Sequence, residues 1–268
     1  MKTSIFLGDA RVFRIYHGDC FAALQKEADL EPTLYTKDDV LKDPQAFSKV
    51  ENIFTTWGMP AFTEEEIRNA FPSLKAVYYA AGSVRYFAAP FLSCGMRVHS
   101  AWAANAVPVA EYTTAQILLA NKGFFKSCRL CSKERALRDE AKRYAEEKSG
   151  NFDASVGIIG AGMIGKMVIR ALKSYDLKVL AYDKFLSKEE LAALGAEKVT
   201  LDELFSRCDT ISNHIANLPE TVGMLRYEHF SRMKKNATFI NTGRGAQVVE
   251  EDLLRALLEE PDRTAILD

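Results

Sequence analysis

The sequence predicts an α/β protein of two domains, each built on a doubly wound parallel sheet, and three observations lead there. Short β-branched and aromatic runs alternate with helix-like segments along most of the 268 residues, which is typical of parallel sheets with helices on both faces. A glycine-rich turn at residues 160–165 joins a buried strand to a helix. Polar residues of interest fall just after strands, where open parallel sheets bind ligands.

The first part of the chain alternates strand and helix signals. Strands are expected at residues 5–7, 34–35, 53–57, 76–80 and 96–99, and a helix at 22–30. The sequence Thr63-Glu64-Glu65-Glu66 has the capping-box pattern that begins a helix. Trp57 and the segment 82–84 follow strands, so they lie at the carboxyl edge of the expected sheet. We place this first domain at residues 1–101.

A helix is expected at residues 110–120, followed by a highly charged stretch at 132–148. We interpret this stretch as a solvated helix, or a helix and loop, that bridges the two domains. Cys128 and Cys131 form a C-x-x-C pair in a helical segment, and no second Cys or His pair stands at zinc spacing. Thiols on a helix face are favoured, and a redox or metal role is the alternative.

The second domain, residues 102–268, is organised around a G-x-G-x-x-G motif between a strand at 155–159 and a helix at 166–174. Gly160 permits the tight turn, Gly162 lets a pyrophosphate approach the backbone, and Gly165 lets the helix pack closely on the strand. The helix N-terminus offers free N–H groups to the phosphates. These features predict a dinucleotide site.

A strand at 178–182 completes a βαβ unit and ends at Asp183. This residue lies 183 − 165 = 18 positions past the last glycine, near the place of a ribose-binding acid. Its carboxylate would accept ribose hydroxyls and repel a 2′-phosphate, so NAD is favoured over NADP, although Lys184 weakens that preference slightly. The alternative is a glycine turn with a surface aspartate.

Three more strands are expected beyond this unit, at residues 209–214, 237–241 and 264–268. His214 stands at the end of the first strand, and Asp268 at the end of the last. Thr242, Gly243 and Arg244 follow the strand at 237–241. Helices are expected after the capping patterns at 187–190 and 200–203, and at 250–258.

Composition narrows the class of protein. The net charge of −1 gives no support for nucleic acid or an anionic membrane as partner. No apolar run approaches the roughly 18 residues of a transmembrane helix, and we expect no signal peptide and no metal site. Five scattered cysteines suggest reduced thiols and a cytoplasmic protein.

These residues carry a resemblance to the D-isomer-specific 2-hydroxyacid dehydrogenases, relatives of D-lactate, glycerate, phosphoglycerate and formate dehydrogenases. The matching segments are 80–84, 105–111, 160–165 with Asp183, 208–221, 241–245 and 266–268. The resemblance implies a flavodoxin-like substrate domain, a Rossmann NAD-binding domain and a homodimer formed through the latter, with 105–119 as interface. It also implies hydride transfer between the nicotinamide and a small 2-oxo or 2-hydroxy acid.

The resemblance assigns roles to residues as well. Arg244 matches the arginine that binds the substrate carboxylate and polarises its carbonyl, as a planar guanidinium can. Backbone amides at Ser83 and Val84 match the loop that holds the carboxylate. Asn105 matches a position near the substrate in formate dehydrogenases, or else it caps a helix. Trp57 shapes the substrate pocket, or else it is a core residue.

His214 matches a histidine that lies by the cofactor, and not the proton donor. Asp268 matches an acid that contacts the nicotinamide carboxamide. The residues expected to bind the cofactor are Gly160, Gly162, Met163, Ile164, Gly165, Asp183, His214, Thr242, Gly243 and Asp268.

The sequence departs from the family at Ala216, where proline is usual, and at Arg85 or Tyr86, where aspartate is frequent. The family also continues past the acid matching Asp268 with a catalytic Glu, a His and a helix that returns to the first domain. Without that pair we expect retained NAD binding and weak or no turnover, a loss of roughly 10²–10⁴-fold or more, with apolar surface exposed on the first domain.

A non-catalytic NAD-binding or sensing module is the main alternative. A fragment that is stabilised by a partner chain is a weaker one. The sequence does not name the substrate.

Overall fold

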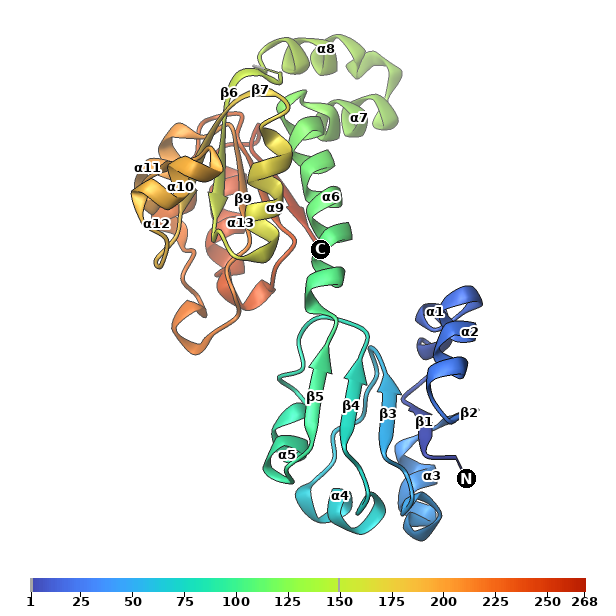
Figure 1. Ribbon diagram of the computed structural model, residues 1–268. Coiled ribbons are helices and arrows are strands. Elements are labelled where there is room, and N and C mark those ends of the chain that lie inside the picture. Colours follow the sequence, from blue (N-terminus) through green and yellow to red (C-terminus); the bar gives the residue numbers. More distant parts are fainter. Residues whose placement is uncertain (1, 149) are drawn as a thin grey trace. The chain divides into compact units, whose positions relative to one another are not determined.

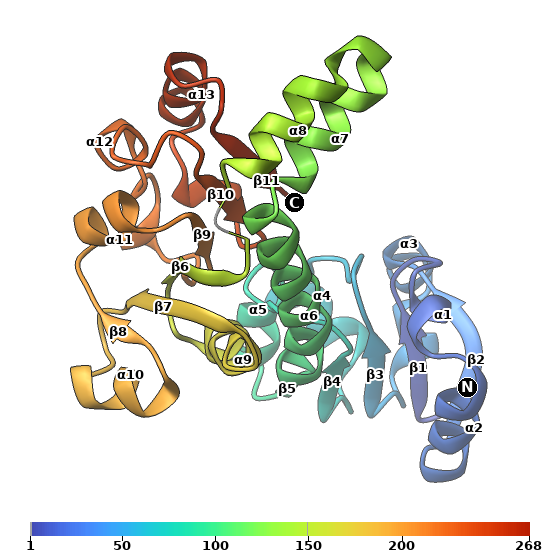
Figure 2. The same ribbon diagram turned by 90° about the horizontal axis from the view of Figure 1, so that it is seen from above.

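The protein is described here by a computed structural model that covers residues 2–148 and 150–268. It divides into two compact units, Met1–Ala106 and Val107–Asp268. Each unit is built on one parallel sheet, as Figures 1 and 2 show. The division falls inside helix α6 (Trp102–Asn121), a few residues after the expected boundary at 101.

The sheet of the first unit has five strands in the order β2-β1-β3-β4-β5, all parallel. Their bounds are β1 Ser4–Leu7, β2 Leu30–Tyr35, β3 Asn52–Thr55, β4 Ala76–Tyr79 and β5 Arg97–Ser100. The chain order reverses between β1 and β3, so the carboxyl ends of these two strands form the switch point at which such sheets bind ligands. The expected doubly wound, flavodoxin-like order is confirmed.

The helices of the first unit are α1 Val12–Ile15, α2 Gly18–Glu27, α3 Lys37–Lys42, α4 Glu64–Ala70 and α5 Ala88–Ser93, with a 3₁₀ turn η1 at Pro44–Phe47. Thr63 caps α4 through a capping box, as predicted, and Thr36 caps α3 in the same way. The prediction that a helix reaches residue 30 is wrong. Leu30 begins β2, where its side chain is buried against a cluster with Phe6 and Phe54.

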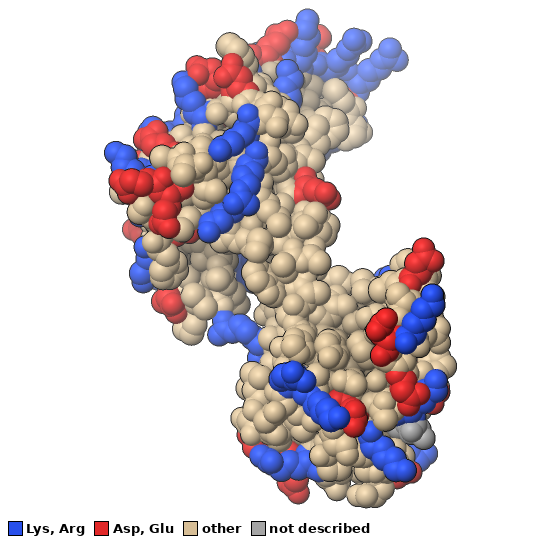
Figure 3. Space-filling view, viewed as in Figure 1, with Lys and Arg blue, Asp and Glu red and all other residues tan. Residues whose placement is uncertain are grey.

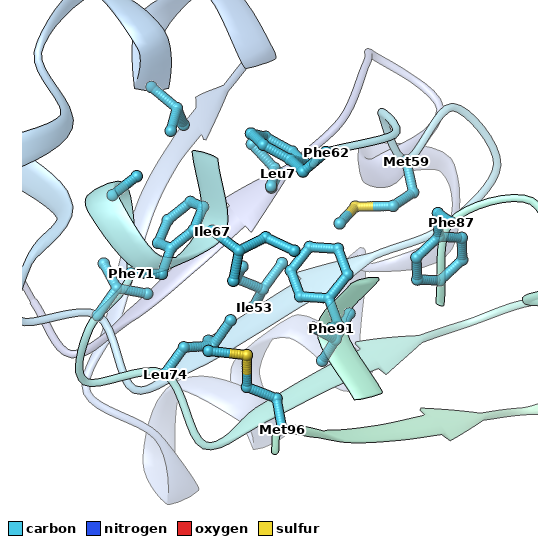
Figure 4. Close-up of a cluster of buried hydrophobic side chains, with 14 of the residues drawn as sticks. Leu7, Ile53, Met59, Phe62, Ile67, Phe71, Leu74, Phe87, Phe91 and Met96 are labelled. Atoms are coloured by element: carbon cyan, nitrogen blue, oxygen red, sulfur yellow. The ribbon is translucent and has the colours of Figure 1, made fainter. Parts of the chain in front are cut away.

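Aromatic and aliphatic side chains fill the core of the first unit (Figure 4). On one face of the sheet, Leu7 and Ile53 pack with Phe71 from just after α4 and Phe91 from α5. On the other face, α1 and α2 cover β1 to β3. There Tyr78 stacks on Phe54 at 5.0 Å and on His99 at 5.1 Å between ring centroids. His99 is exposed, so the helices leave part of this face open at β5.

The sheet of the second unit has six strands in the order β11-β10-β9-β6-β7-β8, and every pairing is parallel. Their bounds are β6 Phe152–Ile159, β7 Asp176–Tyr182, β8 Glu197–Lys198, β9 Thr210–Asn213, β10 Thr238–Asn241 and β11 Thr264–Leu267. This is the Rossmann order, with its switch point between β6 and β9. The glycine turn that follows β6 therefore stands at the switch point.

The helices of the second unit cover both faces of its sheet. They are α6, α7 Phe124–Lys133, α8 Arg138–Glu146, α9 Met163–Leu172, α10 Lys188–Leu194, α11 Leu201–Arg207, α12 Tyr227–Phe230 and α13 Glu250–Glu259. Three short 3₁₀ turns, η2 Arg135–Leu137, η3 Pro219–Thr221 and η4 Gly245–Gln247, complete the unit. Buried side chains of α6, α9 and α10 pack on one face, and those of α11, α12 and α13 on the other.

Two expectations for the middle of the chain need correction. Helix α6 begins at Trp102, eight residues before the expected start, and contains Pro108. An interior proline costs a helix one hydrogen bond and a clash with the carbonyl four residues earlier. The alanine-rich turn before Pro108 is nevertheless helical, and alanine is the best helix former. The charged stretch is no bridge between domains: α7 and α8 belong to the second unit, where Lys126 and Tyr144 bond to Asp262.

The surface matches the balanced composition. Basic and acidic side chains are interspersed on the visible face of each unit (Figure 3). None of the described helices is long and apolar enough to span a bilayer.

Candidate functional site

The glycine turn after β6 is tightly constrained on one side and open on the other. Gly160 has a φ of +89°, and its N–H donates to the Tyr182 carbonyl at 2.8 Å. A Cβ at Gly165 would lie 2.1 Å from the Gly160 carbonyl oxygen, whereas a Cβ at Gly162 would meet no atom within 4 Å. Two glycines therefore permit close packing of α9 on the turn, and the third leaves open space in front of it.

Helix α9 starts at this turn without a side-chain cap. Gly162 occupies the cap position with extended backbone, and the Lys166 N–H donates to its carbonyl at 3.0 Å. Met163 and Ile164 form the first turn, and no acidic residue stands there. Uncapped N–H groups and the helix dipole favour an anion at this end of α9.

Asp183 follows β7 and anchors the turn. Its Oδ2 accepts the Ala161 N–H at 2.8 Å, and its Oδ1 accepts the N–H groups of Phe185 and Leu186 at 2.8 and 2.9 Å. Burial acts to raise the pKa of Asp183, but these bonds and the charge of Lys198 outweigh it and lower the pKa.

A carboxylate has about four acceptor positions, so three backbone bonds leave room for a ribose hydroxyl. The open turn and the ionised carboxylate fit a dinucleotide. The anchoring role of Asp183 was not foreseen from the sequence, where spacing indicated only ribose binding.

His214 lies at the carboxyl end of β9, next to the glycine turn. A Cβ at Gly160 would come within 3.0 Å of the His214 carbonyl carbon and the Ile215 nitrogen. The His214 ring Nε2 is 3.0 Å from the Ser212 hydroxyl, and burial lowers the pKa of the imidazole to about 4. The ring is therefore neutral near pH 7, with its Nε2 engaged by a serine.

The residues after β10 are held by a buried amide network that the sequence reasoning missed. Asn213 Nδ2 donates to Asn241 Oδ1 at 3.1 Å and to Gln247 Oε1 at 2.6 Å. Gln247 Nε2 donates to the Ile215 carbonyl at 2.6 Å, and Asn241 Nδ2 to the Arg244 carbonyl at 3.2 Å. The sequence feature that could have predicted this network is an asparagine at the end of each of two adjacent strands. The network joins the loop after β9 to the loop that carries Arg244.

Three predicted residues stand around this loop. Arg244 is exposed, its Nη1 donates to the Gly243 carbonyl at 3.1 Å, and no ion pair among the described residues includes it. The Thr242 hydroxyl lies 3.1 Å from that of Thr113 in α6. Asp268 follows β11, and its N–H donates to the Asn241 carbonyl at 3.2 Å. The carboxyl edge of this sheet thus gathers the expected cofactor residues and an unpaired arginine side chain.

The first unit gathers its candidates at its own carboxyl edge. The Ser100 hydroxyl donates to the carbonyls of Ala81 and Gly82, which fixes the loop carrying Ser83 and Val84. A Cβ at Gly82 would lie 3.3 Å from Asn105 Nδ2. Asn105 therefore lies against this loop.

The alternative interpretations of two residues are wrong. Helix α6 begins at Trp102 and the Asn105 N–H donates to the Ala101 carbonyl, so Asn105 lies inside the helix and does not cap it. Trp57 is 44% exposed, just past β3, so it is no core residue.

An ion pair at the switch point of the first sheet was not anticipated. Arg11 Nη2 donates to Asp9 Oδ2 at 2.6 Å, and this side-chain bond is the main reason that the pKa of Asp9 falls to about 2. A Cβ at Gly58 would lie 2.1 Å from the same oxygen. The pair therefore packs directly on the turn that follows Trp57. The sequence pattern that could have predicted this pair is an arginine two positions after an aspartate, just past β1.

The second unit matches a known protein family, and most of the chain matches a curated relative. A family model described as the NAD binding domain of D-isomer specific 2-hydroxyacid dehydrogenase matches residues 115–268, more than half of the chain. A formate dehydrogenase of Neurospora crassa is 32% identical over 238 residues, which cover 84% of this chain and 62% of that protein. The chain thus spans less than two thirds of the length of this curated relative.

Solved structures share the fold. The apo form of D-mandelate dehydrogenase from Rhodotorula graminis matches with a TM-score of 0.80 at 22% identity, covering 100% of this chain and 81% of that one. D-lactate dehydrogenase of Aquifex aeolicus, solved with NAD and lactic acid, matches with a TM-score of 0.67 at 26% identity, covering 99% and 76% of the two chains.

Proposed function

The chain belongs to the D-isomer-specific 2-hydroxyacid dehydrogenases, and we propose that it transfers a hydride between NAD and a small 2-oxo or 2-hydroxy acid. Its residues 115–268 match the NAD-binding domain of the family, so the family inferred from the motifs is confirmed and NAD is the cofactor. One observation carries the proposal: the open glycine turn and the ionised Asp183 meet at the switch point of the second sheet.

We assign the cofactor to the carboxyl edge of the second sheet. The turn from Gly160 to Gly165 and the first N–H groups of α9 would hold the pyrophosphate. Asp183 would accept a ribose hydroxyl. His214, Asp268 and the segment Thr242-Gly243 would lie around the nicotinamide. When bound, NAD supplies or accepts the hydride.

We propose substrate-binding residues in each unit. Arg244 is exposed and free of carboxylate partners among the described residues, so its guanidinium is available to a substrate carboxylate. In the first unit, the N–H groups of Ser83 and Val84 would bind the same class of group, and Asn105 and Trp57 would contact the rest of the acid. The roles of these side chains follow from the family and from their places at strand ends.

Steady-state assays of the chain with NADH and a panel of 2-oxo acids, and with NAD and formate, test the activity. The variant Arg244→Gln should lose about 10- to 150-fold in kcat/KM, as expected for a charged hydrogen bond of ~1.5–3 kcal/mol. Arg129→Gln, at an exposed arginine of α7, is the matched control. Turnover that survives Arg244→Gln unchanged would rule out this arginine as the carboxylate ligand.

A non-catalytic NAD-binding module is the second candidate, because the open glycine turn and Asp183 need no proton donor to hold NAD. The neutral His214 imidazole, in contact with Ser212, suits a place beside the cofactor in either candidate. NADH binding with no turnover on any acid of the panel would support this candidate. Robust turnover would eliminate it.

We also propose a homodimer and a cytoplasmic location. Tyr112 and Leu119 of α6 are exposed apolar side chains seven residues apart on one face of the helix, which suits an interface there. Sedimentation should then give the mass of two chains, and Tyr112→Glu should give one. All five cysteines are free, as in a reducing compartment, and recovery of the protein outside the cytoplasmic fraction would contradict that location.

A further inference from the structure

A cavity of about 190 Å³ opens at the amino edge of the second sheet, opposite the glycine turn. It is bordered by Ala154 in β6, by Asp209 just before β9 and by Asn236 just before β10. Lys148, which follows α8, lines it, as do Lys234 and Lys235. None of these residues belongs to the cofactor or substrate edges described above.

The amine of Lys148 is held in this cavity by few groups. Its Nζ donates to the Asn236 carbonyl and lies 5.6 Å from the centre of the Tyr144 ring. Its stem packs against the turn at Gly123, where a Cβ would come within 3.1 Å of Lys148 Cγ. The side chain is half-buried, and no carboxylate forms an ion pair with it among the described residues.

The charges around this amine come from several elements. Burial lowers the pKa of Lys148 to about 8, against the charge of Asp209, which raises it, and together with that of Lys126 in α7, which lowers it. Glu147 accepts from Asn236 Nδ2 at 3.3 Å, and Lys234 pairs with Asp209 at 2.9 Å. Both carboxylates that line the cavity therefore have other partners.

Lys235, at the rim of the cavity, is more exposed than Lys234 beside it. Its nearest carboxylate oxygen, in Asp262, is 3.8 Å away, and its side chain is 69% exposed. A cation at the mouth of a cavity attracts anionic reagents and anionic leaving groups. A volume near 190 Å³ accommodates a short acyl chain with its phosphate.

We propose that this cavity is an acylation site, in which Lys148 is acylated by small acyl phosphates and Lys235 attracts their phosphate group. The neutral Lys148 amine attacks the acyl carbon and a C–N bond forms. The bond between that carbon and the phosphate oxygen breaks, and the phosphate leaves with the electron pair. The amine proton passes to the departing phosphate. The products are an amide and inorganic phosphate, and the lysine loses its charge.

The matched control is Lys142 on α8, six positions earlier, whose side chain is 74% exposed and pairs with Glu146. The whole 268-residue protein is incubated with acetyl phosphate at pH 7.5, and acetylation of each lysine is followed by mass spectrometry. An amine with a pKa near 8 is about one quarter neutral there, against about 0.1% for an ordinary lysine. Lower basicity offsets part of this gain, and we expect Lys148 to react about tenfold faster. A rate for Lys148 no higher than that for Lys142 would overturn the proposal.

Two further measurements separate this site from general lysine reactivity. Between pH 7 and 9.5 the Lys148 rate should level off near pH 8.5, and a rise parallel to that of Lys142 throughout would count against it. Lys235→Gln should slow Lys148 acetylation by acetyl phosphate and leave the reaction with uncharged 4-nitrophenyl acetate unchanged. Equal rates with acetyl phosphate in the variant and the wild type would refute the role of the phosphate.

Discussion

Single glycines and one aspartate set the geometry of the cofactor turn. Gly165 lets α9 approach to a distance at which a Cβ would collide with the Gly160 carbonyl, while Gly162 faces open space. The same residue type therefore serves packing at one position and ligand access at the other.

Replacing these glycines by alanine should separate the two roles. Gly165→Ala places a methyl 2.1 Å from a backbone oxygen, so the free energy of unfolding should fall by about 1–3 kcal/mol or more. Gly162→Ala meets no atom within 4 Å and should cost under about 1 kcal/mol, but it should weaken NADH binding because the methyl fills the open side. Urea denaturation and NADH titration measure the two effects. Unimpaired NADH binding by Gly162→Ala would place the pyrophosphate elsewhere.

Asp183→Asn removes a charge and keeps the size of the side chain. Three N–H groups bond to the carboxylate, so the variant should lose about 1 kcal/mol of stability at this partly exposed site. Because the folded pKa is lowered, the contribution is present above the unfolded pKa of about 3.9 and is lost as the pH falls through the folded value.

The stability difference between the wild type and Asp183→Asn should therefore be constant from pH 7 to 5 and shrink toward pH 3. Denaturation curves across that range measure it. A difference that grows as the pH falls would contradict the lowered pKa. NADPH should also bind relatively better to the variant, because the charge that repels a 2′-phosphate is gone.

At the scale of elements, the amide network joins the ends of β9 and β10 to η4 (Gly245–Gln247). Gln247 is 1% exposed, and Asn213 and Asn241 are buried with it. Buried amides with all partners present rigidify a loop, and an unmatched one is costly. We infer that the network fixes the backbone beside Arg244.

Gln247→Leu should destabilise the protein by about 2–4 kcal/mol, because it strips the Ile215 carbonyl of its donor and Asn213 of one acceptor. The adjacent exposed substitution Ala246→Ser should change stability little and serves as control. Thermal and urea unfolding measure both. A Gln247→Leu protein as stable as the wild type would show that these buried groups find other partners.

Many of the helices and strands could be predicted from the sequence, and the errors in that prediction have physical causes. Capping boxes at Thr63, Ser187 and Thr200 marked helix starts correctly, because the pattern names both partners of a local bond. The start of α6 was predicted too late, because Pro108 argues against a helix there. Residue 30 was predicted to be helical, but Leu30 is buried as the first residue of β2.

Site residues that belong to motifs close together in the sequence could be predicted, and those that depend on contacts between distant segments of the chain could not. The glycine turn and Asp183 are separated by a regular βαβ spacing, so the sequence located both. The Asp9–Arg11 pair on Gly58 and the Gln247 network depend on which strands lie side by side. Their local signals, a charge two residues after Asp9 and asparagines at two strand ends, do not identify the partners on other segments.

At the scale of the molecule, two doubly wound units each gather polar residues at the carboxyl edge of their sheet. The second unit carries the match to the NAD-binding domain of the family, and its glycine turn, Asp183 and uncapped α9 converge at one switch point. NAD binding by this unit is the central claim.

Calorimetric titration of the 268-residue chain with NADH, and separately with NADPH, tests that claim most directly. We predict one NADH site per chain, and NADPH binding at least about tenfold weaker, since Asp183 is ionised at neutral pH and ~1.4 kcal/mol of repulsion suffices for that ratio. Absence of NADH binding, or equal affinity for the two nucleotides, would contradict the account.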